Sequence, residues 1–353
     1  MIPLSLYIHI PWCEKKCPYC DFNSHQAKEN IDEASYIDTL LLDLKNDLKH
    51  YGNTLKDRPI QTIFIGGGTP SLFSPDSIST LLSGIREQIY FADNVEITLE
   101  ANPGSSEVEK FKGFRDTGIN RLSIGVQSFN PIHLKALGRV HNCVEAIAAA
   151  NAAHRAGFDN FNLDLMFGLP EQSTQQSLAD LQQALELKPT HLSCYQLTIE
   201  PNTLFHHNPP ITPGDETLWD MQQALQATLN EYGYSQYEVS AYAQENRQCR
   251  HNLNYWQFGD YLGIGAGAHG KITDLSGLVE RSWKIKHPSS YLQKNEKLGA
   301  RQLLDSDQLP FEFMMNALRL NSGFSVDLFQ ERTTQSINAV SKIIDRHHKQ
   351  GLV

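Results

Sequence analysis

The chain has 353 residues, a formal net charge of −10, 40% hydrophobic residues and 20% charged residues. This balance is ordinary for a globular protein and leaves room for one large domain and a smaller one. The acidic charge, without a basic run, argues against a nucleic-acid partner, and no apolar run approaches the roughly 20 residues of a transmembrane segment. Residues 1–10 are too short and too uncharged for a signal peptide, so we expect a cytoplasmic protein with reduced thiols.

Strand-like and helix-like segments alternate through the first 200 residues. The predicted strands span residues 4–10, 62–65, 95–99, 121–124, 161–167 and 191–196. Helical patterns lie between them, over 37–48 with Gly52 as the end, after Ser74-Pro75, after Asn130-Pro131, and over 142–156 and 174–187. Six such repeats predict a parallel sheet that curls into a full or partial barrel, with a ligand site at the carboxyl ends of the strands.

Three cysteines follow the first predicted strand at the spacing C-x3-C-x2-C: Cys13, Cys17 and Cys20. Three thiolates on one loop suit a [4Fe–4S] cluster and leave one iron open to a small chelating molecule. A structural zinc site usually needs a fourth protein ligand, and neither His9 nor His25 has the usual spacing. A disulfide framework is disfavoured because six cysteines are sparse in a chain of this length. We expect the scattered Cys143, Cys194 and Cys249 to be buried thiols.

Polar or glycine-rich positions stand at the ends of other predicted strands. Gly66-Gly67-Gly68 follows the second strand, Glu100 ends the third, Gln127 follows the fourth, and Asp164 lies within the fifth. Glycine allows close approach of the backbone to a ligand, and free N–H groups there could bind a carboxylate. Each position alone could be a turn, a salt bridge or a cap. Because all of them join the cysteine loop at one edge of the sheet, we expect one shared site.

The pattern changes after residue 201. Residues 206–210 look like a loop, 216–232 like a helix that ends at Gly233, and 263–270 are glycine-rich. Residues 310–353 are helical in pattern and predict a small appended domain. The chain stops at Gly351-Leu352-Val353, where a shortened C-terminus is suspected.

The chain resembles a radical S-adenosylmethionine (SAM) protein of the oxygen-independent coproporphyrinogen oxidase-like family. The motifs that carry the resemblance are 7–13 (YIHIPWC), the three cysteines, 66–70 (GGGTP), 125–128 (GVQS) and 164–170 (DLMFGLP). The resemblance implies an α/β fold, a partial (β/α)6 TIM-like barrel with a smaller, mainly helical C-terminal region. It also implies a core over residues 1–200, an extension over 201–305 and a small helical domain over 306–353.

In that family SAM chelates the open iron of the cluster, and the reduced cluster cleaves it to a 5′-deoxyadenosyl radical. The resemblance implies that Cys13, Cys17 and Cys20 are the cluster ligands. It implies that the SAM site is lined by Tyr7, Tyr19, Gly67, Gly68, Thr69 and Glu100 and extended by Gln127, Arg139 and Asp164.

Two departures separate the chain from the decarboxylating members of the family. Phe22 stands where those members carry a further cysteine, and the chain begins only six residues before Tyr7. Both features match instead the HemW-like branch, regarded as heme chaperones, which carries an H-N-x-x-Y-W motif. Here that motif is residues 251–256, and it implies heme contacts from His251, Tyr255 and Trp256. Taken without the family, the same residues read as a hydrogen-bonded histidine and two core aromatics.

The expected function is therefore heme binding and transfer to acceptor proteins, with a [4Fe–4S] cluster and SAM in the barrel. The alternatives are an oxygen-independent coproporphyrinogen III oxidase and a radical SAM enzyme that acts on another substrate. The expected partners are heme-accepting proteins and an electron donor for the cluster, and a homodimer is plausible for this branch.

Overall fold

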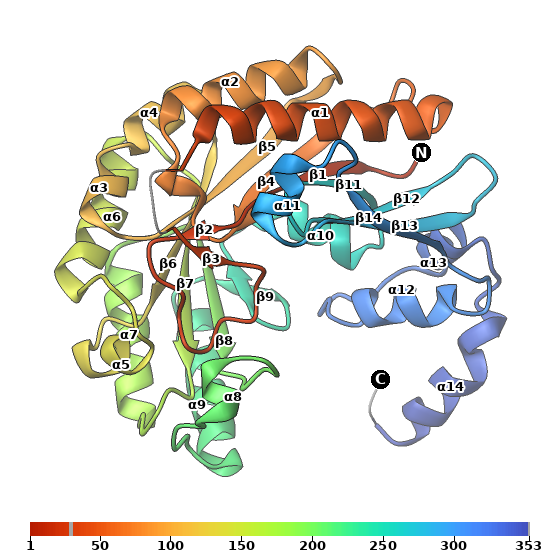
Figure 1. Cartoon of the computed structure of the whole chain (residues 1–353). Coiled ribbons are helices and arrows are strands. Elements are labelled where there is room, and N and C mark those ends of the chain that lie inside the picture. The colour runs from red at the N-terminus through yellow and green to blue at the C-terminus, as the bar shows by residue number, and fades with distance from the viewer. Residues whose placement is uncertain (28–30, 352–353) are drawn as a thin grey trace.

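The computed structural model describes residues 1–27 and 31–351. A curved sheet forms its centre, in the strand order β14-β13-β12-β11-β1-β4-β5-β6-β7-β8-β10-β9 (Figure 1). The six predicted strands are confirmed as its parallel middle: β1 (Leu4–Ile10), β4 (Ile60–Gly67), β5 (Phe91–Ala101), β6 (Arg121–Gln127), β7 (Phe161–Phe167) and β8 (His191–Gln196). The partial barrel expected from the sequence is therefore present.

Helices cover the outer face of the parallel strands (Figure 1). The longer ones are α1 (Glu33–Tyr51), α2 (Pro75–Arg86), α6 (Cys143–Arg155), α7 (Thr174–Glu186) and α9 (Asp215–Glu231); the short ones are α3 (Ser105–Val108), α4 (Phe111–Asp116) and α5 (Pro131–Ala136). A further short helix, α8 (Leu204–His207), lies instead against the segment of the three cysteines, where the N–H of Phe205 donates to the carbonyl of Pro18. Their ends follow local sequence chemistry. The Ser74 hydroxyl caps α2, and the N–H of Gly52, which has a positive φ of 46°, closes α1 on the carbonyl of Leu48.

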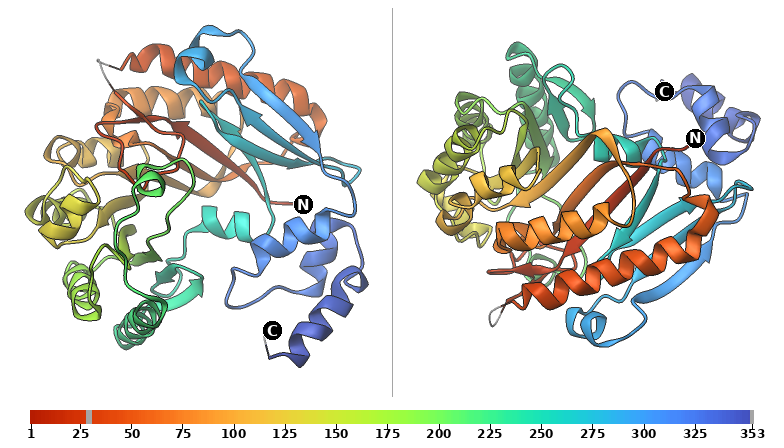
Figure 2. Two further views of the ribbon diagram at one scale, coloured as in Figure 1. Left: turned by 60° about the horizontal axis from the view of Figure 1, so that its bottom comes forward. Right: turned by 90° about the horizontal axis from the view of Figure 1, so that it is seen from above.

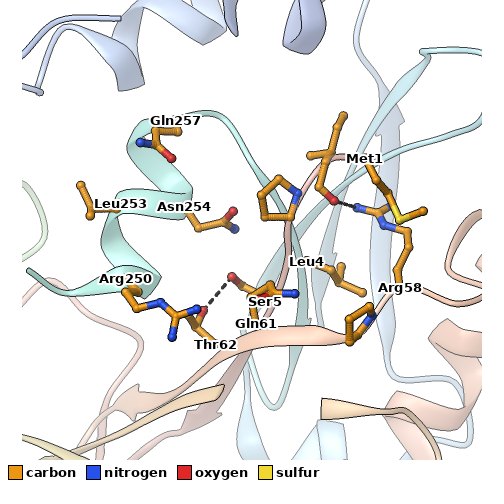
Figure 3. Close-up of a pocket in the computed structure, with 13 residues that line it drawn as sticks. Met1, Leu4, Ser5, Arg58, Gln61, Thr62, Arg250, Leu253, Asn254 and Gln257 are labelled. Carbon is orange, nitrogen blue, oxygen red and sulfur yellow. Dashed lines mark hydrogen bonds between the residues drawn. The ribbon is translucent and has the colours of Figure 1, made fainter. Parts of the chain in front are cut away.

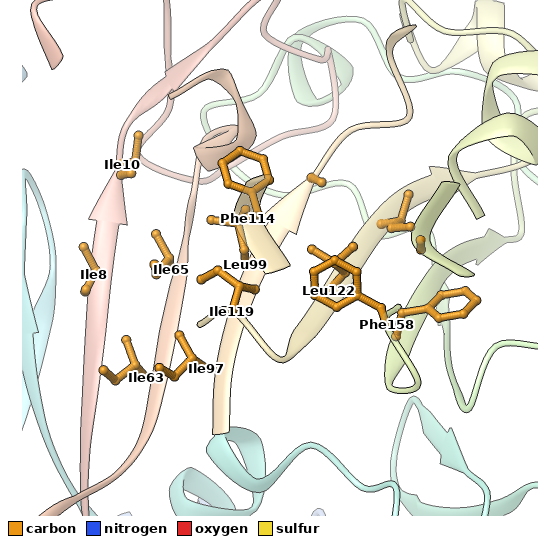
Figure 4. Packing of buried hydrophobic residues seen from close by; sticks show 14 of the residues in the cluster. Ile8, Ile10, Ile63, Ile65, Ile97, Leu99, Phe114, Ile119, Leu122 and Phe158 are labelled. Atoms are coloured by element: carbon orange, nitrogen blue, oxygen red, sulfur yellow. The ribbon is translucent and has the colours of Figure 1, made fainter. Parts of the chain in front are cut away.

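The main core lies between the strands and these helices. Alternate side chains of neighbouring strands point into one layer, and helix and loop residues pack on them (Figure 4). Ile8 of β1, Ile63 of β4 and Ile97 of β5 lie in this layer, and each is almost completely buried. Burial of such a layer is the dominant favourable contribution to the stability of the barrel.

The 201–305 segment extends the sheet at both edges, which the sequence had not predicted. The short strands β10 (Ala241–Ala243) and β9 (Ser235–Glu238) add to β8 in antiparallel fashion. On the other side β11 (Asp260–Ile264) pairs in parallel with β1, and β12 (His269–Thr273), β13 (Val279–Lys284) and β14 (Leu298–Leu303) follow as antiparallel strands. The predicted glycine-rich stretch is thus the corner between β11 and β12.

The end of the described chain is helical, as predicted. It contains α12 (Leu309–Ala317), α13 (Val326–Thr333) and α14 (Asn338–Lys349), while α10 (Arg250–Trp256) and α11 (Pro288–Gln293) precede it. These C-terminal helices have a small core of their own around Phe313 and Phe329 and lie on the side of the barrel away from α6 and α7 (Figure 2). A bridge between Leu320 and Glu238 fastens the segment after α12 to β9. Leu352 and Val353 lie outside the described residues.

Candidate functional site

The cysteine loop, residues 13–20, begins directly after β1. Cys13 belongs to the short strand β2 (Trp12–Cys13), which pairs with β3 (His25–Gln26) and so ties both ends of the loop together. A turn closes the far end, where the N–H of Cys20 donates to the carbonyl of Cys17 over 3.2 Å. All three thiols are free and half-buried. The loop therefore presents its thiols at the carboxyl end of the barrel.

The glycine run after β4 holds the cysteine loop in place. The N–H of Gly68 donates to the carbonyl of Ile10 over 2.8 Å, and the N–H of Thr69 donates to the carbonyl of Trp12 over 2.7 Å. A Cβ on Gly68 would lie 2.5 Å from that same Trp12 oxygen, so the close approach requires glycine. The N–H of Gly67 donates to Glu100 Oε2 over 3.0 Å. All three N–H groups are thus bonded within the protein, and their binding to a ligand stays a prediction.

A cavity of about 480 Å³ lies beneath the loop, and we call it the thiol cavity. It brings together the predicted cluster and SAM residues with the exception of Tyr7; its lining includes Cys13, Cys17, Tyr19, Cys20, Gly67, Gly68, Thr69, Glu100, Gln127, Arg139 and Asp164. These residues come from the cysteine loop, from the ends of β4, β5 and β6, from β7 and from the segment after α5. The expected convergence of polar strand ends is therefore present.

Two carboxylates face the thiol cavity in an environment that disfavours their charge. Burial, with added repulsion from Asp164, raises the pKa of Glu100 to about 7. Burial also raises the pKa of Asp164, although its oxygens accept hydrogen bonds from Ser123 and Asn162. A cation that enters the cavity would stabilise the ionised forms of both carboxyl groups, because a nearby positive charge favours a carboxylate.

Arg139 links the cysteine loop to the strand ends. One terminal nitrogen, Nη2, donates to Asn102 Oδ1 and to the carbonyl of Gly125, each over 2.7 Å, and Nη1 donates to Cys17 Sγ over 3.6 Å. Asn102 in turn donates to the Thr69 hydroxyl over 2.9 Å. Arg139 therefore joins Cys17 of the loop to the ends of β5 and β6.

The donor set of the loop fits a [4Fe–4S] cluster. It offers three cysteine sulfurs that line one cavity, with a buried guanidinium beside one of them. Within residues 1–27 and 31–351, no three His, Cys, Asp or Glu side chains are grouped as a site for a single metal ion. A zinc site of the ordinary tetrahedral kind therefore has no ready-made ligand set in this part of the chain.

Several lining residues were missed by the sequence analysis. Asn102 follows β5 and bonds Arg139, and the Tyr195 hydroxyl donates to Gln127 Oε1 over 2.6 Å. Arg319 reaches the cavity from the segment after α12, where its guanidinium lies 4.3 Å from the ring centre of Trp256. A polar residue after a strand could have suggested Asn102. No local signal could have placed Arg319, because its contact joins distant parts of the chain.

A second cavity of about 600 Å³ adjoins the first, and we call it the imidazole cavity. Cys20, Phe22, Gly67 and Glu100 line both. The imidazole cavity also contains the predicted SAM residue Tyr7, which the thiol cavity lacks. The other members of its lining are His9, Lys16, Asp21, Asn23, Pro201, Asn202, Tyr255, Gly267, His269 and Lys286. The two cavities are therefore neighbours, with these four shared residues in the walls of both.

The predicted heme motif is divided between these spaces. Tyr255 lines the imidazole cavity and Trp256 lines the thiol cavity, where the Trp256 indole N–H is buried with no hydrogen-bond partner among the described residues. His251 lines neither of them. The structure therefore brings Tyr255 and Trp256 to the cavities of the cysteine loop but leaves His251 outside.

His251 is packed inside the barrel and is only 1% exposed. Its Nδ1 lies 2.8 Å from the Thr62 hydroxyl and its Nε2 lies 3.0 Å from the Tyr255 hydroxyl. Burial, followed by the charge of Arg121, lowers the pKa of His251 to about 3, so the ring is neutral. Both ring nitrogens are engaged, as in the local hydrogen-bonding interpretation of the motif. Its role as a heme ligand stays a prediction.

A third cavity, of about 370 Å³, lies at the opposite ends of β1 and β4 (Figure 3). Arg250 and Leu253 of α10 face Ser5 and Thr62 of the strands there. The Thr62 hydroxyl is hydrogen-bonded to the Ser5 hydroxyl over 2.7 Å and also to His251 Nδ1. Thr62 thus connects the lining of the third cavity to His251. α10 therefore separates the third cavity from the two at the carboxyl ends of the strands.

The remaining cysteines are mostly as predicted. Cys194 and Cys249 are buried, and burial raises the pKa of each to about 12. Cys143 differs from the prediction and is half-buried, because it stands in the first turn of α6. Within residues 1–27 and 31–351, no helix combines the length and the apolar character needed to cross a bilayer.

Comparison with known proteins places the chain in a family. The Radical SAM superfamily model matches residues 7–182, and the HemN C-terminal domain model matches residues 304–353. Proteins named heme chaperone HemW are 53% identical in Haemophilus influenzae, over 97% of this chain and 89% of that protein, and 52% identical in Escherichia coli, over 90% and 83%.

A solved structure agrees with this placement. Coproporphyrinogen III oxidase (HemN) from Escherichia coli, described as a radical SAM enzyme, superposes with a TM-score of 0.84 at 25% identity, and the match covers 100% of this chain and 84% of that one. The chain therefore belongs to the radical SAM superfamily and, within it, to the branch of the proteins named heme chaperone HemW.

Proposed function

We propose that this protein is a heme chaperone, which binds heme and passes it to acceptor proteins while it carries a [4Fe–4S] cluster and SAM. The observation that carries the proposal is the position of the 251–256 motif beside the cysteine loop. Tyr255 and Trp256 line the two cavities that also share Cys20. High identity to proteins named heme chaperone HemW supports the same function.

In this proposal Cys13, Cys17 and Cys20 hold the cluster, and SAM occupies the thiol cavity. A reduced cluster of this kind supplies the electron that can cleave SAM. Glu100 and Asp164 provide negative charge for the cationic groups or ribose hydroxyls of SAM, while Arg139 steadies the loop through Cys17. Tyr19, Gly67, Gly68, Thr69 and Gln127 shape the walls, and Tyr7 contributes from the adjoining cavity.

We further propose an electron donor for the cluster, heme-accepting proteins as partners, and a homodimer. The three-part division into residues 1–200, 201–305 and 306–353 is retained as a proposal. The free thiols suit a reducing compartment, so we propose a cytoplasmic location.

SAM affinity is expected to fall about tenfold when the pH is lowered from 8 to 6. The pKa of Glu100 is raised to about 7 by burial and by Asp164, so its carboxylate is lost across this range and with it the attraction for a cation. Glu100→Gln should bind at pH 8 about as weakly as the wild type at pH 6. Both the pH dependence of the wild type and the affinity of Glu100→Gln are measured by equilibrium binding of SAM to the anaerobically reconstituted proteins. Glu109→Gln, which changes an exposed carboxylate, is the control, and a flat wild-type profile would refute the assignment of Glu100.

The proposed function is tested by titration of the full-length protein with heme. We expect about one heme per chain, an absorption spectrum typical of a ligand-bound iron, and transfer of that heme to an apo-heme protein that is mixed with it. The same reconstituted sample, with SAM, a reductant and coproporphyrinogen III, should form no protoporphyrinogen. No specific heme binding would exclude the chaperone, and protoporphyrinogen formation would favour the oxidase alternative instead.

A further inference from the structure

The histidine of the 251–256 motif is poorly placed to bind heme iron in this fold. Both of its ring nitrogens are hydrogen-bonded, and the ring lies among Tyr7, Phe64 and Tyr255, with centroid distances of 6.5, 5.2 and 4.8 Å. Release of the Tyr255 contact alone would still leave the ring inside the barrel. An iron ligand must therefore be sought among the side chains that line the adjoining cavity.

The imidazole cavity contains two histidines, and they differ in their bonding. His9 is buried, and its ring nitrogens lie 3.0 Å from the Tyr7 hydroxyl and 3.0 Å from the carbonyl of Asn23. His269, at the start of β12, is exposed, and within the described part of the chain neither of its ring nitrogens forms a hydrogen bond. Trp283, its register partner on β13, lies at a ring-centroid distance of 6.4 Å and an interplanar angle of 29°. His269 is thus an imidazole held on one side by an aromatic ring, with its nitrogens free.

The charges and apolar groups around His269 suit a porphyrin with two carboxylates. Lys16 and Lys286 line the same cavity and can attract carboxylates. The acidic residues of its lining are Asp21 and Glu100. Phe22 lines it too and is 62% exposed, so its ring is accessible to cover a porphyrin ring. The volume of about 600 Å³ lies within the usual size of small-molecule sites, roughly 300 to 1,000 Å³.

We propose that heme binds in the imidazole cavity, with His269 as the axial ligand of the iron and with Lys16 and Lys286 beside the propionates. This inference rests on the proposed heme-chaperone function and assigns its binding site. His251 is then a positioning residue, because its bond to the Tyr255 hydroxyl holds that side chain at the cavity wall. Although the residue is exposed, partial desolvation of its ring, followed by the charges of Lys286 and Arg281, lowers the pKa of His269, so its imidazole is neutral and able to bind iron at neutral pH.

The test is heme titration of the full-length protein and of His269→Ala, His251→Asn and His207→Ala. His207 is an exposed histidine on α8 outside both cavities, and its variant is the matched control. We expect His269→Ala to weaken heme binding by more than about tenfold and to lose the imidazole-type iron spectrum, which added free imidazole should restore. His207→Ala should keep both the wild-type affinity and that spectrum. His251→Asn, which loses the bond to Tyr255, should weaken heme binding but keep the imidazole-type spectrum, because His269 remains. A further variant, Lys286→Glu, should weaken binding and leave the spectrum unchanged.

The outcomes separate the inference from the proposed function. If the wild type binds heme and His269→Ala binds it with the same affinity and spectrum, the inference is overturned and the chaperone function stands. Loss of the spectrum in folded His251→Asn, with a normal His269→Ala, overturns the inference in the same way. If the wild type binds no heme, both the proposed function and the inferred heme site are overturned. Circular dichroism melting of each variant establishes that it is folded.

Discussion

Replacement of Cys17 by serine is expected to abolish the [4Fe–4S] cluster without unfolding the protein. Serine keeps the size of the side chain but removes the soft sulfur ligand, and the two remaining thiols cannot hold three irons. Cys17 is half-buried in a loop that backbone hydrogen bonds fix independently of its side chain. Iron and acid-labile sulfide should fall close to zero after anaerobic reconstitution, measured per folded chain.

Cys143→Ser provides the matched control, since Cys143 is also half-buried but stands at the start of α6. It should retain the full iron and sulfide content. Cys17 lines the thiol cavity but not the imidazole cavity, so Cys17→Ser should bind heme as the wild type does. Full cluster content in Cys17→Ser would contradict its assignment as a ligand.

Asp260→Asn is expected to lower the free energy of unfolding by about 3–5 kcal/mol. Asp260 is fully buried on β11, where Oδ2 accepts from Arg58 Nη2 over 2.8 Å and Oδ1 accepts from Lys271 Nζ over 2.9 Å. Asparagine would leave these two buried cations without a charged partner. The shift of the urea unfolding transition measures the loss.

The control is Asp159→Asn, because the Asp159 side chain is 75% exposed and forms a surface ion pair with Arg247 over 3.5 Å. Its effect should stay below about 1 kcal/mol.

Burial alone would raise the pKa of Asp260, but Lys271 and Arg58 outweigh burial and lower it below 3.8. The stabilisation by Asp260 is therefore full above pH 4 or so and is lost as the pH falls through the lowered pKa. If the difference in the free energy of unfolding between wild type and Asp260→Asn stayed the same in strong acid, this account would be contradicted.

The barrel was predictable because its strands and helices have simple local signatures. β1, β7 and β8 match the predicted ranges, and β4, β5 and β6 contain the shorter predicted ones. Caps such as Ser74 and stops such as Gly52 follow rules that involve only neighbouring residues. Alternation of these elements was enough to indicate a parallel sheet with its site at one edge.

The strands β11 and β12 could not be predicted because they contain charged residues, which a sequence pattern assigns to the surface. β11 and β12 carry Asp260 and Lys271, which look like surface residues in the sequence, and these two residues pair with each other in the interior. The glycines of the corner between the strands suggested a loop for the same segment. Only the three-dimensional neighbours of a charged residue decide whether it can be buried.

The candidate site was predicted in its components but not in its bonding. The cysteines, Glu100 and Asp164 meet in one cavity, as the strand ends indicated. The engagement of the Gly67 and Gly68 N–H groups was not foreseeable, because their acceptors depend on the path of the cysteine loop. The same holds for His251, whose partner Thr62 lies on a strand distant in sequence.

The first strand of the chain lies in the interior of the sheet, between β4 and β11. During synthesis β1 can pair with β4 as soon as residue 67 is available, but its other neighbour begins only at Asp260. Until the ribosome has made β11, the nascent protein carries an apolar strand with one unpaired edge, the kind of surface that recruits other chains. Any fragment that stops before Asp260 keeps this edge open, so we expect it to be prone to aggregation, and the edge of β1 is covered only late in translation.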